Sequence, residues 1–137
     1  KRASSYAKYL GVDLVLCHKQ RAKANVVESM KIIGDVKGKN VIILDDMVDT
    51  AGTITKAADL MIENGALSVR AFASHGVLSD PATERIEKSK LTAIYFTDSI
   101  PLKKESEKIK VLSVADLIAN TIINVNTNKS ISSSYLV

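Results

Sequence analysis

Residues 41–53 (VIILDDMVDTAGT) constrain the fold of this chain more than any other stretch. The stretch begins with four large apolar residues, 41–44, and such an uninterrupted run is typical of a buried strand. Two adjacent carboxylates, Asp45 and Asp46, follow at the carboxyl end of this expected strand. A short segment of small and hydroxyl residues, 49–53, then leads into a helical pattern, so the stretch indicates a strand–loop–helix unit.

The segment 49–53 has the composition of a phosphate-binding loop. Free N–H groups at the start of a helix attract anions, and small residues let a phosphate approach the backbone closely. We expect Gly52 to supply backbone angles that other residues resist, and the hydroxyls of Thr50 and Thr53 to donate further hydrogen bonds. An ordinary helix N-cap formed by Asp49 or Thr50, without a ligand, is the alternative. The preceding carboxylates suit sugar hydroxyls, so the stretch predicts a site for a phosphorylated sugar.

The remainder of the chain alternates between strand-like and helix-like segments. Strands are predicted at residues 13–17, 30–33, 40–44, 69–74 and 91–96. Helices are predicted to end at Leu10 and at Asn64-Gly65, to begin at Asp80 as N-cap with Pro81 in the first turn, and to begin at a capping box from Ser113 to Asp116. This alternation predicts an α/β fold with a doubly wound, mostly parallel sheet flanked by helices.

Ligands of a doubly wound sheet bind outside the carboxyl ends of its strands. Asp45 and Asp46, a basic segment that begins at Lys19, and His75 all come just after predicted strands. We therefore expect these residues to gather along one edge of the sheet. The basic segment, residues 19–25, has no apolar side chain larger than alanine, which predicts a mobile loop.

Composition excludes several classes of function. Nineteen basic and fifteen acidic residues give a net charge of +4, spread without the arginine-rich, aromatic-interleaved stripe of a nucleic-acid-binding surface. No apolar run approaches the ~18 residues that a membrane span needs. The single cysteine, Cys17, excludes an internal disulfide and fits a reducing, cytoplasmic compartment. We expect this cysteine to be buried and inert at a strand end.

The histidines and paired carboxylates do not predict a metal site, and no metal ligand is assigned. His18 and His75 lie far apart in the sequence, without Cys or Glu at ligand spacing. Asp45 and Asp46 would point to opposite faces of a strand, which disfavours a shared metal ion unless the strand has ended. We expect His75 to form a structural hydrogen bond and His18 to lie on a loop surface.

Residues 41–53 resemble the phosphoribosyl-diphosphate (PRPP) binding motif, which type I phosphoribosyltransferases share with ribose-phosphate diphosphokinases, the PRPP synthetases. Flanking segments resemble the synthetases in order along the chain: 17–26 (CHKQRAKANV), 33–39 (IGDVKGK), 74–79 (SHGVLS), 97–101 (TDSIP), 108–115 (KIKVLSVA) and 130–136 (SISSSYL). The chain resembles the C-terminal half of these two-domain proteins. By this resemblance, residues 1–123 form a phosphoribosyltransferase-type domain, and residues 124–137, rich in Asn and Ser, form a C-terminal tail.

The resemblance implies transfer of the diphosphate of ATP to the 1-hydroxyl of ribose 5-phosphate, giving PRPP and AMP. It implies that Lys19 and Arg21 are catalytic cations which close over the transferred diphosphate, where charge builds on the phosphoryl oxygens. Lys23 is a weaker third candidate. A solvated surface cluster is the alternative interpretation of these three cations. The implied ribose-5-phosphate site comprises Arg21, Asp45, Asp46, Asp49, Thr50, Ala51, Gly52 and Thr53.

The resemblance also implies partners. Mg²⁺ would accompany ATP, with its protein ligands in the N-terminal half that this chain lacks, and the protein would be a homo-oligomer. The serine-rich tail would help form a regulatory anion site between subunits, whereas a disordered end is the alternative. Two other functions remain open. One is a type I phosphoribosyltransferase, which would need a hood that recognises the nucleobase. The other is a non-catalytic, synthetase-associated or regulatory subunit.

Overall fold

The computed structural model describes residues 2–20 and 29–132. Within these residues the elements follow one another in this order: α1 (Arg2–Leu10), β1 (Leu16–Gln20), β2 (Ser29–Ile33), β3 (Asn40–Val48), α2 (Gly52–Glu63), β4 (Ser68–Gly76), α3 (Ala82–Lys88), β5 (Ala93–Thr97), β6 (Ile109–Leu112) and α4 (Ala115–Asn126). In the part of the chain that is described, no helix is long and apolar enough to cross a membrane.

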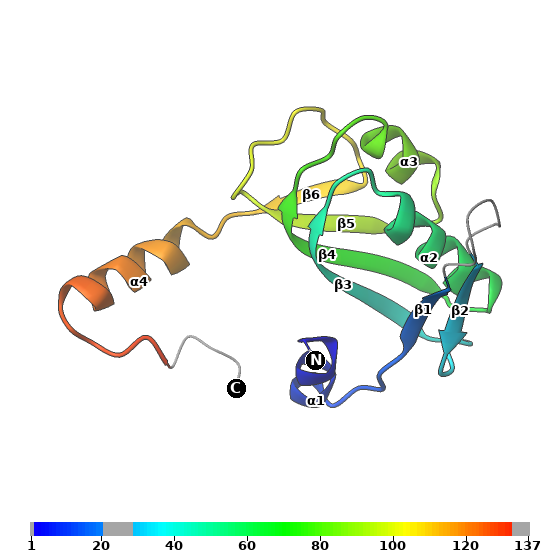
Figure 1. The fold of residues 1–137 in the computed structure, drawn as a ribbon, viewed down its shortest axis with the longest axis horizontal. Coiled ribbons are helices and arrows are strands. Elements are labelled where there is room, and N and C mark those ends of the chain that lie inside the picture. The colour runs from blue at the N-terminus through cyan, green and yellow to red at the C-terminus, as the bar shows by residue number, and fades with distance from the viewer. Residues whose placement is uncertain (1, 21–28, 133–137) are drawn as a thin grey trace.

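The centre of the fold is a parallel four-stranded sheet with the order β3-β4-β5-β6. Helix α2 connects β3 to β4 and helix α3 connects β4 to β5, and both cover the same face of the sheet (Figure 1). This arrangement confirms the predicted α/β fold with a parallel sheet and flanking helices. The strands follow their sequence order because each short crossover returns the chain to the neighbouring position.

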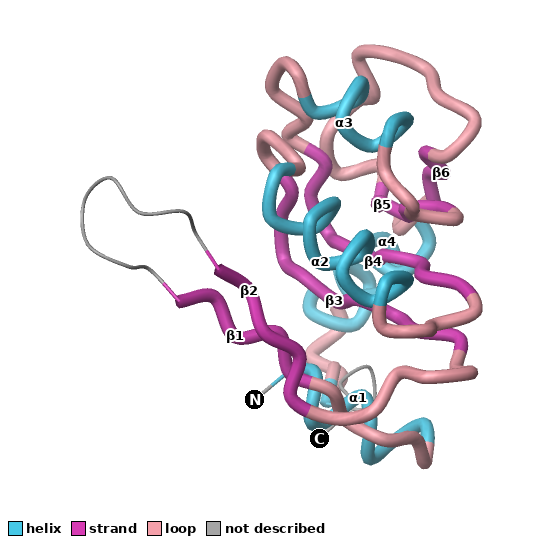
Figure 2. The backbone as a smooth tube through the Cα atoms, turned by 90° about the vertical axis from the view of Figure 1, so that its right-hand side faces the viewer, coloured by secondary structure: helices cyan, strands magenta, loops and turns pink. Residues whose placement is uncertain are grey.

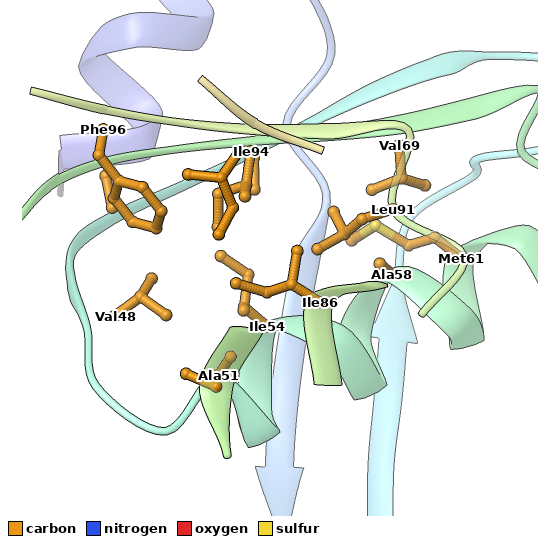
Figure 3. Close-up of a cluster of buried hydrophobic side chains, with 14 of the residues drawn as sticks. Val48, Ala51, Ile54, Ala58, Met61, Val69, Ile86, Leu91, Ile94 and Phe96 are labelled. Atoms are coloured by element: carbon orange, nitrogen blue, oxygen red, sulfur yellow. The ribbon is translucent and has the colours of Figure 1, made fainter. Parts of the chain in front are cut away.

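The main core lies between this face of the sheet and helices α2 and α3 (Figure 3). The alternation of β4 points Val69, Ala71 and Ala73 toward the helices, as expected for a period of two residues. Helix α2 meets them with the predicted apolar face, residues Ile54, Ala57, Ala58 and Met61. Thr55 is buried with that face, which the apolar pattern did not predict.

The opposite face of the sheet carries an aromatic pair. Phe72 on β4 and Tyr95 on β5 are register partners, and their rings stack with centroids 4.6 Å apart and an interplanar angle of 8°. A half-open cavity of about 450 Å³ lies over this pair, and Ala3 and Tyr6 of α1 help to line it. Helix α1 is thus placed against the face that α2 and α3 leave free.

The first two strands form a separate antiparallel sheet, in which Leu16 pairs with Ile33 and Gln20 with Ser29. The hairpin projects away from the four-stranded sheet (Figure 2). The strand predicted at 13–17 is found at Leu16–Gln20 instead, so Lys19 lies in β1 rather than in a loop. The reason is cross-strand pairing, because an antiparallel partner satisfies the backbone of a polar segment that shows no apolar alternation.

Two predicted helix starts were wrong in detail. Helix α3 begins at Ala82 with Pro81 as N-cap, because Asp80 forms an ion pair with Lys104 (Nζ–Oδ1 2.6 Å) instead of a cap. Helix α4 begins at Ala115 with Val114 as N-cap and without a side-chain cap. The expected capping box does not form. The Ser113 oxygen accepts from the Ala115 amide at 3.3 Å, and its hydroxyl donates to Asp98 on the preceding loop.

Helix α4 continues to Asn126, so the expected boundary between residues 123 and 124 lies inside a helix. None of its residues is buried, and it projects from the end of the sheet beyond β6 (Figure 1). Its only tie to the sheet edge in the described part is the Asp98 carboxylate. This carboxylate also accepts a hydrogen bond from the Val114 amide at 3.0 Å. The predicted tail residues 133–137 lie outside the described residues.

Candidate functional site

The paired carboxylates lie within β3, because the strand continues to Val48 rather than ending at Leu44. Asp45 pairs with Ala73 and Val48 with Gly76, so β4 supports the strand past both carboxylates. The Asp45 carboxylate accepts a hydrogen bond from the Asp46 amide (2.9 Å), and the Asp46 carboxylate accepts one from the Met47 amide (2.9 Å). Both carboxylates are exposed at the carboxyl-end edge of the sheet, as predicted.

These carboxylates share the rim of the aromatic cavity with hydroxyl groups from the next strands. Asp45 and Asp46 from β3, Ser74 from β4 and Thr97 from β5 all contribute to its lining. The parallel sheet brings these side chains together because each stands near the carboxyl end of its own strand. The cavity therefore offers carboxylate acceptors and hydroxyl groups over an apolar floor, a combination that suits a sugar.

The loop after β3 contains a left-handed residue at Ala51, with φ 58° and ψ 4°. We expected Gly52 to supply the unusual backbone angles, and this prediction was wrong, because Gly52 opens α2 without a positive φ. Packing in the core holds Ala51 in this conformation, since the residue is only 4% exposed (Figure 3).

Two consecutive backbone carbonyl groups of this loop accept hydrogen bonds from residues of α2 and α3. The carbonyl of Thr50 accepts a hydrogen bond from Nη1 of Arg85 at 2.9 Å. The carbonyl of Ala51 accepts hydrogen bonds from the Thr55 amide at 3.1 Å and from the Thr55 hydroxyl at 2.8 Å. With both carbonyl oxygens engaged by α2 and α3, the loop leaves its N–H groups as the free polar groups at the start of the helix.

The amides of Gly52 and Thr53 have no acceptor among the described residues. Helix α2 also lacks a side-chain N-cap, so the alternative of an ordinary cap by Asp49 or Thr50 was wrong. The side chains of Asp49, Thr50 and Thr53 are exposed instead. A helix that presents uncapped amides beside exposed hydroxyls is suited to bind an anion such as phosphate.

The carboxyl ends of β4 and β5 and the turn after β5 are joined by a small hydrogen-bond network. Nδ1 of His75 lies 2.8 Å from the hydroxyl of Ser99, which confirms the expected structural hydrogen bond. The Thr97 hydroxyl donates to the carbonyl of Ser74 at 2.6 Å, and the Ser99 hydroxyl lies 3.2 Å from the same oxygen. These bonds fix the edge of the sheet on which Ser74 and Thr97 face the cavity.

The basic segment is not brought to this edge by the described residues. The backbone of Lys19 pairs with Met30 in the separate hairpin, while Arg21 and Lys23 lie outside the described residues. His18 is exposed in β1 rather than on a loop. Cys17 is exposed in the same strand, so the expectation of a buried cysteine was wrong. Desolvation nevertheless raises the pKa of its thiol, which therefore stays protonated near neutral pH.

Two residues that hold the site were missed in the sequence. Thr55 lies on the buried face of α2 among apolar residues, where only its spacing of four from Ala51 indicated the hydroxyl-to-carbonyl bond. Arg85 lies 35 residues from Thr50, and no local pattern indicated their contact. Within residues 2–20 and 29–132, no three His, Cys, Asp or Glu side chains are grouped closely enough to hold a metal ion.

Comparison with known proteins gives a family match for most of the chain. Residues 15–137 match the model of the phosphoribosyl synthetase-associated domain. The ribose-phosphate pyrophosphokinase of Porphyromonas gingivalis is 60% identical over 135 residues, which cover 98% of this chain and 43% of that protein. The ribose-phosphate pyrophosphokinase of Wolinella succinogenes is 53% identical over 135 residues, which cover 98% of this chain and 44% of that protein.

A solved structure has the same fold. The crystal structure of phosphoribosylpyrophosphate synthetase from Mycobacterium smegmatis superposes with a TM-score of 0.82 at 41% sequence identity, and the match covers 91% of this chain and 41% of that one. The chain thus spans less than half the length of the relatives that it matches.

Proposed function

Because the chain belongs to the phosphoribosyl synthetase-associated domain family, we propose that it is part of a ribose-phosphate diphosphokinase and holds the sugar phosphate. The reaction transfers the diphosphate of ATP to the 1-hydroxyl of ribose 5-phosphate and releases AMP. The names of relatives up to 60% identical support this assignment. Since the chain spans under half of those proteins, the activity belongs to the longer protein of which it is a part.

The observation that carries the proposal is the loop between β3 and α2. Its carbonyl oxygens are bonded to Arg85 and Thr55, while the amides of Gly52 and Thr53 stay free to donate. These amides, with the hydroxyls of Thr50 and Thr53, would bind the 5-phosphate. The anion would neutralise the positive end of helix α2, so negative charge is favoured there over a neutral group.

The ribose would lie between this loop and the paired carboxylates. Asp45 would accept hydrogen bonds from the ribose hydroxyls, with Asp46 as a second acceptor, and Asp49 would border the phosphate. Ionised carboxylates form shorter and stronger hydrogen bonds with hydroxyl groups than neutral acceptors do. Bound at both ends in this way, the sugar would present its 1-hydroxyl in a defined orientation to the diphosphate, which lowers the entropic part of the barrier.

Lys19 and Arg21 are proposed as the cations that stabilise the transferred diphosphate, on the strength of family resemblance. Lys19 lies in a hairpin apart from the main sheet, so this role requires the hairpin to approach the sugar site when substrates are bound. Cations that meet the phosphoryl oxygens only in the transition state accelerate the chemical step rather than tighten substrate binding.

Mg²⁺ is proposed to enter with ATP. The described residues do not fit a resident metal site, because they bring no three potential ligands together. By the family resemblance, its protein ligands are proposed to lie in the half of the synthetases that this chain does not match. A homo-oligomeric assembly and a cytoplasmic location also stay predictions.

The proposal is tested by incubating the intact protein with ATP, Mg²⁺ and ribose 5-phosphate and measuring AMP. Release of diphosphate from PRPP in the presence of a nucleobase, without AMP formation from ATP, would instead identify a phosphoribosyltransferase. The loop is tested by calorimetric titration of ribose 5-phosphate into wild-type protein and the Asp49→Ala and Thr53→Val variants. Unaltered affinity in both variants would contradict the assignment of the phosphate to this loop.

A non-catalytic subunit is the second candidate, because the matching family is described as a synthetase-associated domain. Such a subunit would bind ribose 5-phosphate or PRPP at the same loop without forming AMP. Such a subunit would therefore bind ribose 5-phosphate in the calorimeter and lose this binding in the loop variants. It would form no AMP in the activity assay. The two measurements together separate the candidates.

A further inference from the structure

Arg85 joins helix α3 to the loop that begins α2. Its Nη1 donates a hydrogen bond to the carbonyl of Thr50 at 2.9 Å, across 35 residues of sequence. The same nitrogen lies beside Gly52, since a Cβ built on that glycine would be 3.5 Å away. The guanidinium group therefore contacts the backbone on which the proposed phosphate site depends, without itself belonging to the segment 49–53.

The position of Arg85 is set by a rigid helix. Its neighbour Ile86 and, three residues earlier, Ala82 are fully buried, so α3 is anchored in the core. Ile86 lies in the buried cluster shown in Figure 3. The anchored helix fixes the backbone of Arg85, so only the side-chain rotamers remain to be ordered when the hydrogen bond forms. Arg85 can therefore hold the Thr50 peptide in a fixed orientation. A side chain on a free surface loop could not do so.

The carboxylate of Glu84, whose pKa is lowered chiefly by its hydrogen bond with Lys88, also interacts electrostatically with Arg85. Glu84, the preceding residue, pairs with Lys88, and the described residues provide no ion pair to Arg85 itself. A guanidinium is always charged at neutral pH, so Arg85 brings a positive charge next to the start of α2. Because salt screens charges over about 8 Å under physiological conditions, a cation in contact with the loop contributes to the potential that a bound anion meets.

We propose that Arg85 is a positioning residue for the sugar-phosphate site. It turns the Thr50 carbonyl away from the anion and holds the left-handed turn at Ala51, so that the amides of Gly52 and Thr53 face the ligand. If the Thr50 peptide rotated freely, its carbonyl oxygen would compete with these donors and repel the phosphate. This inference rests on the proposed function for the identity of the ligand, but the ordering of the loop can be measured without any ligand.

The test compares Arg85→Met and Arg85→Lys with wild type in the intact protein. Lys88→Met is the matched control, because it also removes one cation from the exposed side of α3. We expect Arg85→Met to raise the KM for ribose 5-phosphate about tenfold, with kcat and the KM for ATP within twofold of wild type. Arg85→Lys should restore most of the affinity, since an ammonium group can donate to the same carbonyl, and Lys88→Met should behave as wild type.

Amide hydrogen exchange without ligand provides the second readout. Arg85→Met should accelerate exchange of the Thr55 amide, whose hydrogen bond to the Ala51 carbonyl depends on the loop turn, while the core amides of β4 stay protected as in wild type. Unchanged exchange of this amide would overturn the proposal, and so would faster exchange with an unchanged KM. A uniform loss of kcat and stability would also count against it, as a purely structural role predicts that result. If wild type forms no AMP, the proposed function fails, while Thr55 amide exchange and phosphate titration still decide the role of Arg85.

Discussion

The hydroxyl of Thr55 donates a hydrogen bond to the carbonyl of Ala51 at 2.8 Å, and the Thr55 amide bonds to the same oxygen at 3.1 Å. This pair connects the first turn of α2 to the left-handed residue of the loop after β3, which we propose binds the phosphate. Thr55 is only 6% exposed, so its hydroxyl has no access to water as an alternative partner. A polar residue thus occupies the buried face of α2 in order to hold the loop that precedes it.

Replacing Thr55 by valine should lower the free energy of unfolding by about 1 kcal/mol, because a buried hydrogen bond is lost while the shape is kept. Urea denaturation measures this change. Thr121→Val is the control, since Thr121 makes the same bond to a carbonyl four residues earlier on the exposed helix α4. Equal losses in the two variants would show that the Thr55 bond has no special role in the loop.

Lys108 closes the C-terminal end of helix α3. Its Nζ donates to the carbonyls of Ser89 (2.6 Å) and Glu87 (2.9 Å), where helix carbonyls lack partners and a positive charge is favoured. Lys108→Met should therefore destabilise the protein by about 1–2 kcal/mol. Lys110→Met, two residues further along the chain in β6, should cost less than half as much in the same urea titration. Similar losses in the two variants would contradict the capping role.

Gly76 is required by the packing of Phe96. A Cβ built on Gly76 would lie 2.9 Å from Cγ of Phe96, a ring that is 3% exposed and held in the core. Gly76→Ala should cost about 1–3 kcal/mol because the ring cannot move aside without strain. Gly52→Ala is the matched control, as its nearest contact would be an ordinary 3.5 Å to Arg85. Thermal unfolding should separate the two, and a Gly76→Ala variant as stable as wild type would refute the steric argument.

The pKa of Asp98 lies below its ordinary value of 3.8, chiefly because the Ser113 hydroxyl and then the Val114 amide donate to its charged form. A depressed pKa means that the anchoring of α4 is complete above the unfolded value and is lost as pH falls through the folded value. NMR titration should give a midpoint below 3.8 for the Asp98 carboxyl, and Ser113→Ala should move it upward. An unmoved midpoint in that variant would remove the hydroxyl as the cause.

Lys19 is the residue whose replacement should affect chemistry most. If it meets the transferred diphosphate, Lys19→Ala should lower kcat by about 10²–10³-fold, with a small change in the KM for ribose 5-phosphate. Lys31→Ala, on the facing strand β2, is the control for loss of a cation from the hairpin. Steady-state measurement of AMP formation gives kcat and KM for both variants and shows whether their effects differ. Equal effects of the two substitutions would indicate a general effect of charge rather than a catalytic role.

Much of the fold was predictable because it depends on local patterns. Three patterns can be seen in consecutive residues: the apolar run at 41–44, the helical face of α2 and the alternation of β4. Burial of these apolar faces dictates a parallel sheet covered by helices. The loop 49–53 was recognised from its composition for the same reason. Small and hydroxyl residues between a strand and a helix are a local property.

What failed depended on partners distant in the chain. Lys19 lies in a strand because its segment pairs with β2. Asp80 bonds to Lys104 instead of capping α3. Each of these groups had a local and a remote partner of similar hydrogen-bonding energy, so only the packed structure could decide between them.

By itself the sequence determined the class of fold, the strand–loop–helix unit and the chemical character of its site. Tertiary structure alone decided how that site is held, because the contact of Arg85 with Thr50 exists only after α3 has packed against α2. It also decided that Ala51, and not Gly52, takes the left-handed conformation, since burial of its methyl group outweighs the local preference for glycine.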